Sequence, residues 1–326
     1  MNAFSHGAAY GAVIVSTLLA VVAIGIWFER KLAGRMQSRL GPTMVGPVGL
    51  LQPIADIVKL LQKEDIVPAN ADRRLFDLAP ILAALCALGV AAAVPFSSSV
   101  VAADLDVGVL YVLAIGGLTV IPTFTAGWAS NNKFALLGAM RAIAQSVSYG
   151  VVLALAVLVP VILAGSMNLS SIVTWQADHH WFAVWPIFPG LPAFVLFFLA
   201  MLAEANRIPF DIPEAESELV AGVTTEYTGA KFTLFYLAEY VHTLVGSAVG
   251  AVLFLGGWDG PFAPGLGWMV AKTLALFVVV YWVRWSLLRL RSDQLMEICW
   301  KRLVPLGVGL VLAAAAWVQF GPGGGR

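Results

Sequence analysis

Seven carboxylates gather in one short part of the chain, between two long apolar runs. They are Glu204, Asp211, Glu214, Glu216, Glu218, Glu226 and Glu239. Arg207 and Lys231 are the only cations in this stretch, which holds over a third of the 19 acidic residues. Ionisable groups beside apolar runs of this length are costly to desolvate and usually mark the path of an ion or a substrate. Proton movement is therefore the first chemistry that this cluster indicates.

The spacing of these acids favours the wall of a cavity. Pro209 and Pro213 prevent one continuous helix. Glu214 and Glu218 can share a helical face, whereas Glu216 points elsewhere. Acids that point in several directions suit a cavity, and a plain solvated acidic loop is the alternative. Because grouped acids repel one another, we expect a raised pKa for at least one of Glu216 and Glu218.

Composition indicates an integral membrane protein. Of the 326 residues, 60% are hydrophobic and 12% are charged, whereas soluble domains carry about 25% charged residues. The formal net charge of zero excludes a basic nucleic-acid-binding protein. Cys86 and Cys299 form no CxxC or Cys/His cluster, so we expect no metal or iron–sulfur site on this chain. The N-terminus lacks the features of a cleaved signal peptide.

Eight apolar runs approach the roughly 20 residues that a transmembrane helix needs. We therefore expect an all-α, polytopic membrane protein with one transmembrane domain over residues 1–326. The eight transmembrane helices are predicted at residues 7–28, 75–96, 108–127, 143–165, 183–203, 233–256, 267–285 and 303–320.

Loop charges predict the orientation of these helices. The loops that follow the odd-numbered spans hold 17 of the 19 Lys and Arg residues. Positively charged loops stay on the cytoplasmic side of a membrane, so both termini are predicted to lie outside. The two main cytoplasmic segments are then the loop 29–74, which contains an amphipathic helix, and the acidic loop 204–231.

Residues 48–64 carry the pattern of an amphipathic helix at the membrane surface. Gln52, Asp56, Lys59 and Lys63 recur at helical spacing and form one polar stripe, while aliphatic residues fill the other side. The segment is too short and too charged to cross a bilayer, so we expect it in the cytoplasmic interface. A surface anchor and one wall of a lateral passage for a lipid-like molecule are both compatible with this pattern.

Further polar residues lie near the ends of the spans or inside them. Glu29 directly precedes Arg30 at the end of the first span, where the two could form a pair. Arg141 stands where the fourth span begins, and polar residues there usually face the bundle interior. Glu239 lies well inside the sixth span, which costs about 2.5–3.5 kcal/mol unless it pairs, protonates or meets water. His242 is interpreted as an ordinary helix residue in preference to a proton carrier.

Taken together, these segments resemble the H subunits of bacterial NADH-quinone oxidoreductase (respiratory complex I) and their mitochondrial counterpart, NADH dehydrogenase subunit 1. The resemblance runs over about residues 27–305. It rests on ERKLAGRMQSRLGP from Glu29, GLLQPIADIVKLLQKE from Gly49, GWASNNKFALLGAMRAIAQSVSY from Gly127, AEANRIPFDIPEAESELVAGVTTEY from Ala203, LAEY from Leu237 and RSDQLMEICWK from Arg291. No single piece is a generic motif, and all occur in order.

The resemblance implies eight transmembrane helices in the bacterial plasma (inner) membrane, with both termini periplasmic. It implies a subunit without a redox cofactor, which contacts quinone and the other membrane-arm and peripheral-arm subunits; NADH, FMN and iron–sulfur clusters belong to those partners. By motif match, Glu29, Arg30, Asp56, Lys59 and Arg141 would line the quinone chamber. The proton-coupling carboxylates would be Glu204, Asp211, Glu214, Glu216, Glu218, Glu226 and Glu239. No residue is assigned as catalytic, and no metal ligand is expected.

One departure from the family pattern puts the proton route in doubt. Gly150 follows Tyr149 at a position where the resembling subunits usually have an acid. The function predicted from the whole pattern is a membrane subunit of a proton-translocating NADH-quinone oxidoreductase. The alternatives are the membrane anchor of a related ion-pumping hydrogenase complex and a stand-alone ion transporter.

Overall fold

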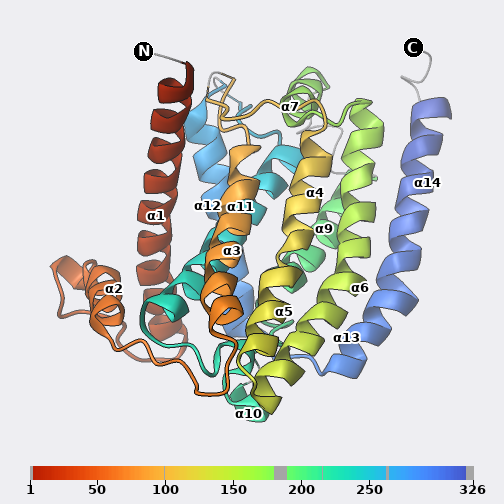
Figure 1. Ribbon diagram of the computed structural model, residues 1–326. Helices are drawn as coiled ribbons and strands as arrows, with labels where there is room; N and C mark the ends of the chain where they lie inside the picture. Colours follow the sequence, from red (N-terminus) through yellow and green to blue (C-terminus); the bar gives the residue numbers. More distant parts are fainter. Residues whose placement is uncertain (1–2, 99, 180–188, 215, 262–263, 321–326) are drawn as a thin grey trace.

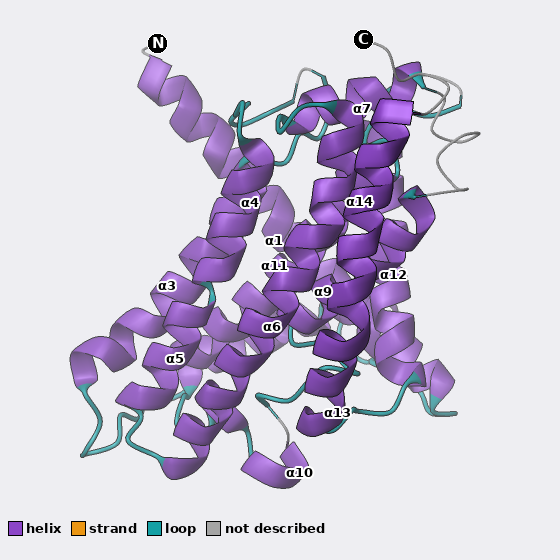
Figure 2. Cartoon of the chain, turned by 90° about the vertical axis from the view of Figure 1, so that its right-hand side faces the viewer, coloured by secondary structure: helices purple, strands orange, loops and turns teal. Residues whose placement is uncertain are grey.

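The computed structural model describes residues 3–98, 100–179, 189–214, 216–261 and 264–320. This part of the chain is helical and contains no strand (Figure 2). The helices, labelled in Figure 1, are α1 Ala3–Met36, α2 Gln52–Gln62, α3 Arg73–Ala92, α4 Gly108–Leu118, α5 Val120–Ala129, α6 Lys133–Ala164, α7 Leu169–Asp178, α9 Gly190–Glu204, α10 Glu216–Leu219, α11 Gly229–Phe254, α12 Leu266–Ser286, α13 Ser292–Ile298 and α14 Val304–Phe320. Short 3-10 turns lie at Pro47–Gly49 and Gly222–Thr224.

Seven helical stretches are long and apolar enough to cross a membrane, and they confirm seven of the predicted spans. They are Gly11–Met36, Arg73–Ala92, Gly108–Ala129, Lys133–Ala164, Gly229–Phe254, Leu266–Ser286 and Ser292–Phe320. The predicted span 183–203 corresponds to α9, which has 15 described residues. At 1.5 Å per residue, α9 is about 22 Å long, short of a hydrocarbon core of about 30 Å. Because residues 180–188 lie outside the described part, the count of eight stays a prediction.

The outer surface of the bundle is apolar, as expected where lipid replaces water. Ile24, Leu85 and Leu312 are 56%, 59% and 65% exposed on three different helices. In water such an apolar surface would be unfavourable. In a bilayer it matches the acyl chains, and the hydrogen bonds within each helix satisfy the backbone.

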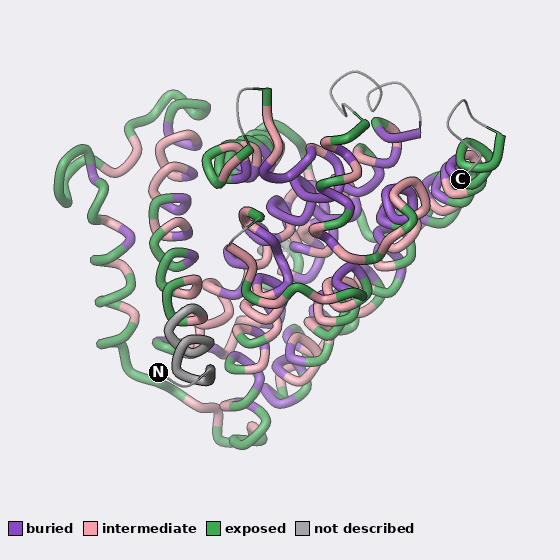
Figure 3. The backbone as a smooth tube through the Cα atoms, turned by 90° about the horizontal axis from the view of Figure 1, so that it is seen from above, coloured by how far each residue is buried: buried purple, intermediate pink, exposed green. Residues whose placement is uncertain are grey.

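Helix α11 lies at the centre of the bundle. In the most apolar 18-residue stretch of α11, 78% is buried, against 22–44% in the corresponding stretches of the other six spanning segments. The view along the bundle axis shows buried segments surrounded by partly exposed helices (Figure 3). Glu239, the last of the seven carboxylates, belongs to α11. Because α11 is central, Glu239 lies in the interior of the bundle.

Two spans contain interruptions that follow from proline. Thr119 separates α4 from α5, and Pro122 lacks the N–H that would bond the Leu118 carbonyl. A π-helical turn at Cys299–Leu303 joins α13 to α14, and Pro305 likewise leaves the Lys301 carbonyl without its i+4 donor. The break at Thr119 matters for function because it lies against the acidic segment.

The beginning of α1 and the end of α14 lie at the same end of the bundle, and α2, α10 and α13 lie at the other (Figure 1). We call the latter the basic end, because the loops rich in Lys and Arg are found there. At this end, Lys231 Nζ lies 2.7 Å from Asp65 and 2.5 Å from Asp77. The hydroxyl of Thr228 accepts a hydrogen bond from the Ile66 N–H at 3.1 Å. These contacts fasten the segment after α2 to the start of α11.

Candidate functional site

The first part of the segment between α9 and α11, up to Glu214, folds back into the bundle. Arg207, Phe210 and Ile212 are 1%, 4% and 2% exposed. From α6, the buried amide of Gln145 donates to the carbonyls of Ala203 at 2.6 Å and Phe210 at 2.8 Å. A polar side chain is stable in the interior when its donors are used in this way, and Gln145 thereby fixes the path of the acidic segment.

Glycines allow the segment to lie directly against its neighbours. A Cβ at Gly138 of α6 would come within 2.9 Å of the Pro213 carbonyl oxygen. At Gly222, where φ is +54°, the corresponding distance would be 1.8 Å. Only glycine combines this backbone conformation with so close an approach. The two positions bring Pro213 and its neighbour Glu214 in toward the centre of the bundle.

A cavity of about 310 Å³ lies where this segment meets α3, α5 and α11. Three of the predicted proton-coupling residues line it, namely Glu204, Glu214 and Glu239. His242 and Arg284 also contribute to its wall. The cavity is far larger than the roughly 10–15 Å³ needed for one water molecule, and carboxylates supply the polar partners that buried water requires.

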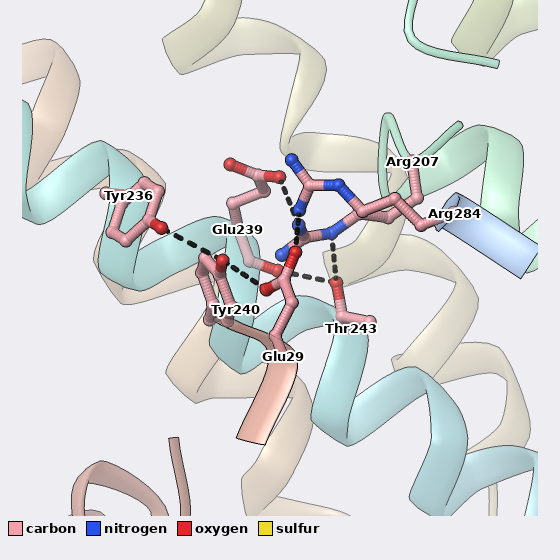
Figure 4. Close-up of polar contacts among 7 residues, drawn as sticks. All are labelled: Glu29, Arg207, Tyr236, Glu239, Tyr240, Thr243 and Arg284. Atoms are coloured by element: carbon pink, nitrogen blue, oxygen red, sulfur yellow. Dashed lines mark hydrogen bonds and ion pairs between the residues drawn. The ribbon is translucent and has the colours of Figure 1, made fainter. Parts of the chain in front are cut away.

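Beside the cavity, charged and hydroxyl groups from α1, α11 and α12 form a connected network (Figure 4). Arg284 donates to Glu29 at 2.7 Å, and the Tyr240 hydroxyl donates to the other oxygen of Glu29 at 2.5 Å. The hydroxyls of Tyr236 and Tyr240 lie 2.9 Å apart. Glu29 is 3% exposed, so this charge is kept in the interior by an arginine and a phenol.

Arg207 forms the second half of the network. Its Nη1 lies 3.1 Å from Glu239 Oε1, and its Nε donates to the Thr243 hydroxyl at 3.3 Å. The guanidinium carbon also lies 4.3 Å from the ring centroid of Tyr240. Burial alone would lower the pKa of Arg207, but Glu239, Tyr240 and Glu29 raise it well above its ordinary value. The guanidinium therefore stays charged inside the bundle.

Two carboxylates of the segment have raised pKa values. Burial raises the pKa of Asp211, and the negative charge of Glu239 raises it further. Burial raises the pKa of Glu214 well above its usual range, and Glu239 and Asp211 add to this effect. Such groups hold a proton at a pH where an exposed carboxyl has lost it. This is the property that a proton-transferring acid needs near neutrality.

The structure separates Glu29 from Arg30, which the sequence had suggested as a pair. Adjacent helix residues point about 100° apart, because a turn takes 3.6 residues. Glu29 points into the network of α11 and α12, whereas Arg30 forms an ion pair with Asp56 of α2. Gln52 donates to the same carboxylate at 3.0 Å. Glu29 thus connects α1 to α11 and α12, and Arg30 connects α1 to α2.

Helix α2 confirms the predicted amphipathic segment and its polar stripe. Gln52 and Asp56 face α1, while Ile54, Val58 and Leu61 are 54%, 46% and 60% exposed on the opposite side. An outward apolar face suits the boundary between water and lipid. Lys59 is exposed, and the described residues provide no ion-pair partner for it.

Other predicted site residues lie at the edge of the basic end. Glu218 accepts from Arg141 at 2.5 Å and lies 3.3 Å from Arg289. The hydrogen bond from Arg141 lowers the pKa of Glu218, and the charge of Arg289 lowers it further. A raised pKa, which was predicted for at least one of Glu216 and Glu218, is therefore wrong for Glu218. The attraction of two arginines outweighs the repulsion between neighbouring acids. The side chain of Glu216 lies outside the described residues, so the expectation for Glu216 stays a prediction.

Glu226 and Arg141 do not join the cavity. Glu226 accepts from Asn132 at 2.5 Å, beside an open hollow at the basic end. Arg141 is engaged by Glu218, and neither Arg141 nor Glu226 is among the residues that line the 310 Å³ cavity. Over the described parts of the chain, no group of three His, Cys, Asp or Glu side chains is placed to hold a metal ion.

Sequence reasoning missed several residues of this site. Arg284 binds Glu29 from 255 positions away. Gln145 holds the acidic segment from inside a spanning helix. The signal that could have found both is the rule that polar side chains in a spanning helix need a partner there.

Comparison with known proteins agrees with this architecture. The family model described as NADH dehydrogenase matches residues 9–315. A Dehalococcoides mccartyi protein, named as the H subunit of NADH-quinone oxidoreductase, is 48% identical over 313 residues, which are 96% of this chain and 86% of that protein. Proteins of the same name from Geobacillus thermodenitrificans and Brevibacillus brevis are 50% and 46% identical, covering 93% and 97% of this chain and 92% and 96% of their own lengths. The chain therefore belongs to the NADH dehydrogenase family, among the H subunits of NADH-quinone oxidoreductase.

Proposed function

We propose that this membrane subunit of NADH-quinone oxidoreductase forms a quinone-binding chamber and the carboxylate path that couples quinone reduction to proton translocation. The observation that carries the proposal is the acid-lined cavity, to whose wall the Arg207 and Glu29 network contributes Glu239 and Arg284. Reduction of a quinone to a quinol takes two electrons and two protons. Partner subunits with NADH, FMN and iron–sulfur clusters supply the electrons, and this chain handles protons.

The quinone part of the proposal rests on the contact between α1 and α2. The Arg30–Asp56 pair and Gln52 provide hydrogen-bond donors and acceptors next to the exposed apolar face of α2. A quinone has polar carbonyls on an apolar body, so it suits a surface that is polar on one side and open to lipid on the other. Glu29, Lys59 and Arg141 were also predicted here. Glu29 instead bonds to Tyr240 and Arg284, which favours the proton path for it, and the pairing of Arg141 with Glu218 favours a structural role for Arg141.

The proton part of the proposal rests on the hydroxyl pair of α11. Tyr236 and Tyr240 are hydrogen-bonded to each other, and Tyr240 donates to Glu29. A chain of this kind can pass protons because each hydroxyl is both donor and acceptor. Asp211, Glu214 and Glu239 then form the acidic end of the path, and Glu204 also lines the cavity.

The basic end is proposed to face the cytoplasm of a bacterial cell, where the soluble subunits dock, with both termini in the periplasm. This predicts that cysteines replacing Ser98 and Lys133 in a variant without Cys86 and Cys299 react with an impermeant label from opposite sides. Labelling of both from one side would contradict the orientation.

The quinone site is tested by adding bulk between Gln52 and Lys59 with Ala55→Trp. The apparent KM for quinone in the assembled complex should rise, while NADH oxidation by a soluble artificial acceptor should not change. Val58→Trp on the exposed apolar face is the matched control and should leave the KM near wild type. Equal effects of the two tryptophans, or loss of both activities in Ala55→Trp, would contradict a quinone site on this face.

A further inference from the structure

A second, smaller cavity adjoins the acid-lined cavity. The smaller cavity has a volume of about 40 Å³ and lies between α4, α6, α9 and α11. Glu204 and His242 line both cavities, so the two side chains stand where the cavities meet. Every other side chain that lines the smaller cavity is aliphatic, aromatic or that of Met201.

Two glycines make room at this junction. A Cβ on Gly116 of α4 would lie 2.9 Å from Glu204 Oε1, so the carboxyl group of Glu204 is directed against the backbone of α4. A Cβ on Gly246, one turn beyond His242, would lie 3.0 Å from the side chain of Met201. Larger residues at either position would close the space beside Glu204 and His242.

The smaller cavity has room for a few water molecules at roughly 10–15 Å³ each. Water in a buried site needs two to four polar partners, and here only Glu204 and His242 provide side-chain partners. Among the described residues we find no hydrogen bond to either ring nitrogen of His242. A neutral imidazole carries one donor and one acceptor nitrogen, and a water molecule in this space can bond to either.

Helix α6 brings no ionisable group to this place. Its face toward the smaller cavity is formed by Leu153 and Val157, and Gly150 lies one turn earlier on the same face. A Cβ at Gly150 would have no atom within 4 Å. A proton that passes this point has therefore only α9 and α11 to supply a carrier, through Glu204 and His242.

We propose that His242 is a proton-carrying partner of Glu204 at the junction of the two cavities. The protonated Glu204 gives its proton, through one water, to the acceptor nitrogen of neutral His242. The products are a glutamate anion and an imidazolium cation, so charge is conserved. The imidazolium then gives the proton from its other nitrogen, through water, to the ionised carboxylate of Glu239 in the wall of the larger cavity, and is neutral again. The inference rests on the proposed carboxylate path.

The charged groups that face His242 across the larger cavity are Glu214, Glu239 and Arg284, together with Glu204. The phenol of Tyr236 also lines this cavity. The residues of α3 and α5 in its wall are alanines and threonines and do not titrate. Glu239 and Arg284 offset each other in charge while Glu204 and Glu214 hold their protons, and the anion that Glu204 becomes after giving up its proton favours a transient imidazolium beside it.

The test uses the whole complex in proteoliposomes, with NADH oxidation and the resulting proton gradient measured together. His242→Gln keeps a polar side chain that can bind water but takes up no proton near neutrality. His242→Leu fills a similar volume with an apolar side chain, and His242→Glu supplies a different titratable group. His179→Leu, which removes an exposed histidine at the end of α7, is the control. Glu204→Gln tests the path itself. Electron transfer to a soluble artificial acceptor measures how much complex is assembled.

We expect His242→Gln and His242→Leu to slow coupled turnover per assembled complex by about tenfold or more, because a positioned proton-transfer group contributes about 10²–10⁴-fold and water replaces part of it. His242→Glu should recover much of the loss. Wild-type coupling in His242→Gln together with a loss in Glu204→Gln overturns the role of His242 and leaves the carboxylate path standing. Wild-type coupling in Glu204→Gln overturns the path, and the inference with it.

Discussion

The acidic segment has an interior part and an edge part that differ in charge state. In the interior, Asp211 and Glu214 are shielded from water, and burial raises their pKa values. At the edge, Glu218 has a side chain that is 45% exposed and lies between two arginines, which lower its pKa. The three acids lie within eight positions of one another in the sequence. Burial and the nearest charge, and not the residue type, decide which of them holds a proton.

The two parts differ in the role that their carboxylates can have, which is proton transfer in one and structural pairing in the other. A carboxyl that retains its proton near neutrality can exchange it during turnover. A carboxylate that stays ionised between Arg141 and Arg289 instead links α6, α10 and the segment after α12. We therefore place proton transfer in the interior part and assign Glu218 to the positioning of that part.

The largest expected effect is that of removing the interior cation. Arg207→Met leaves Glu239 without its ion partner inside the bundle, and breaking a buried pair costs about 3–5 kcal/mol. The amount of folded protein and its thermal unfolding temperature in detergent should both drop sharply. Arg291→Met breaks an exposed pair with Asp293 and is the matched control, for which we expect little change. Similar stability of the two variants would show that the interior network is not held by Arg207.

A smaller effect concerns the pH dependence of stability. The pKa of Glu214 is raised in the folded state, so the unfolded chain loses this proton first as pH rises. Stability is then lost from about pH 4.3, the ordinary glutamate pKa, up to the raised pKa of the folded state. Glu214→Gln cannot ionise and should flatten the fall in unfolding temperature between about pH 5 and 8. An unchanged slope in Glu214→Gln would contradict a raised pKa at this position.

The smallest effect is expected at the edge. Glu218→Gln should lower stability by about 0.2–1 kcal/mol at pH 7, because partly exposed ion pairs contribute little. The pKa of Glu218 is lowered in the folded state, so its contribution is present above the ordinary glutamate pKa of about 4.3 and is lost as pH falls below it. The difference between wild type and variant should therefore vanish under acid conditions and shrink at high salt. A difference that persists in acid would argue against the ion pairs.

Helices that follow from a local residue pattern could be predicted from the sequence. Ion pairs between residues far apart in the chain could not. Runs of apolar residues predicted the seven spanning helices, although the spans at Gly11–Met36, Lys133–Ala164 and Ser292–Phe320 each depart from the prediction by eight residues or more at one end, and helical spacing predicted α2. No local pattern shows that Glu29 binds Arg284, because the two lie 255 positions apart. Adjacency suggested Glu29 with Arg30, which helix geometry forbids. Repulsion between neighbouring acids would raise the pKa of Glu218, whereas Arg141 and Arg289, both distant in sequence, reverse the direction.

The central claim is that the interior carboxylates, and not the edge one, carry the coupled protons. The most direct test is the number of protons moved per NADH oxidised by complexes with Glu214→Gln or Glu218→Gln in proteoliposomes. Each value is normalised to the amount of complex measured with a soluble electron acceptor. The account predicts a ratio well below wild type for Glu214→Gln and a ratio near wild type for Glu218→Gln. A full ratio in Glu214→Gln with a reduced ratio in Glu218→Gln would contradict it.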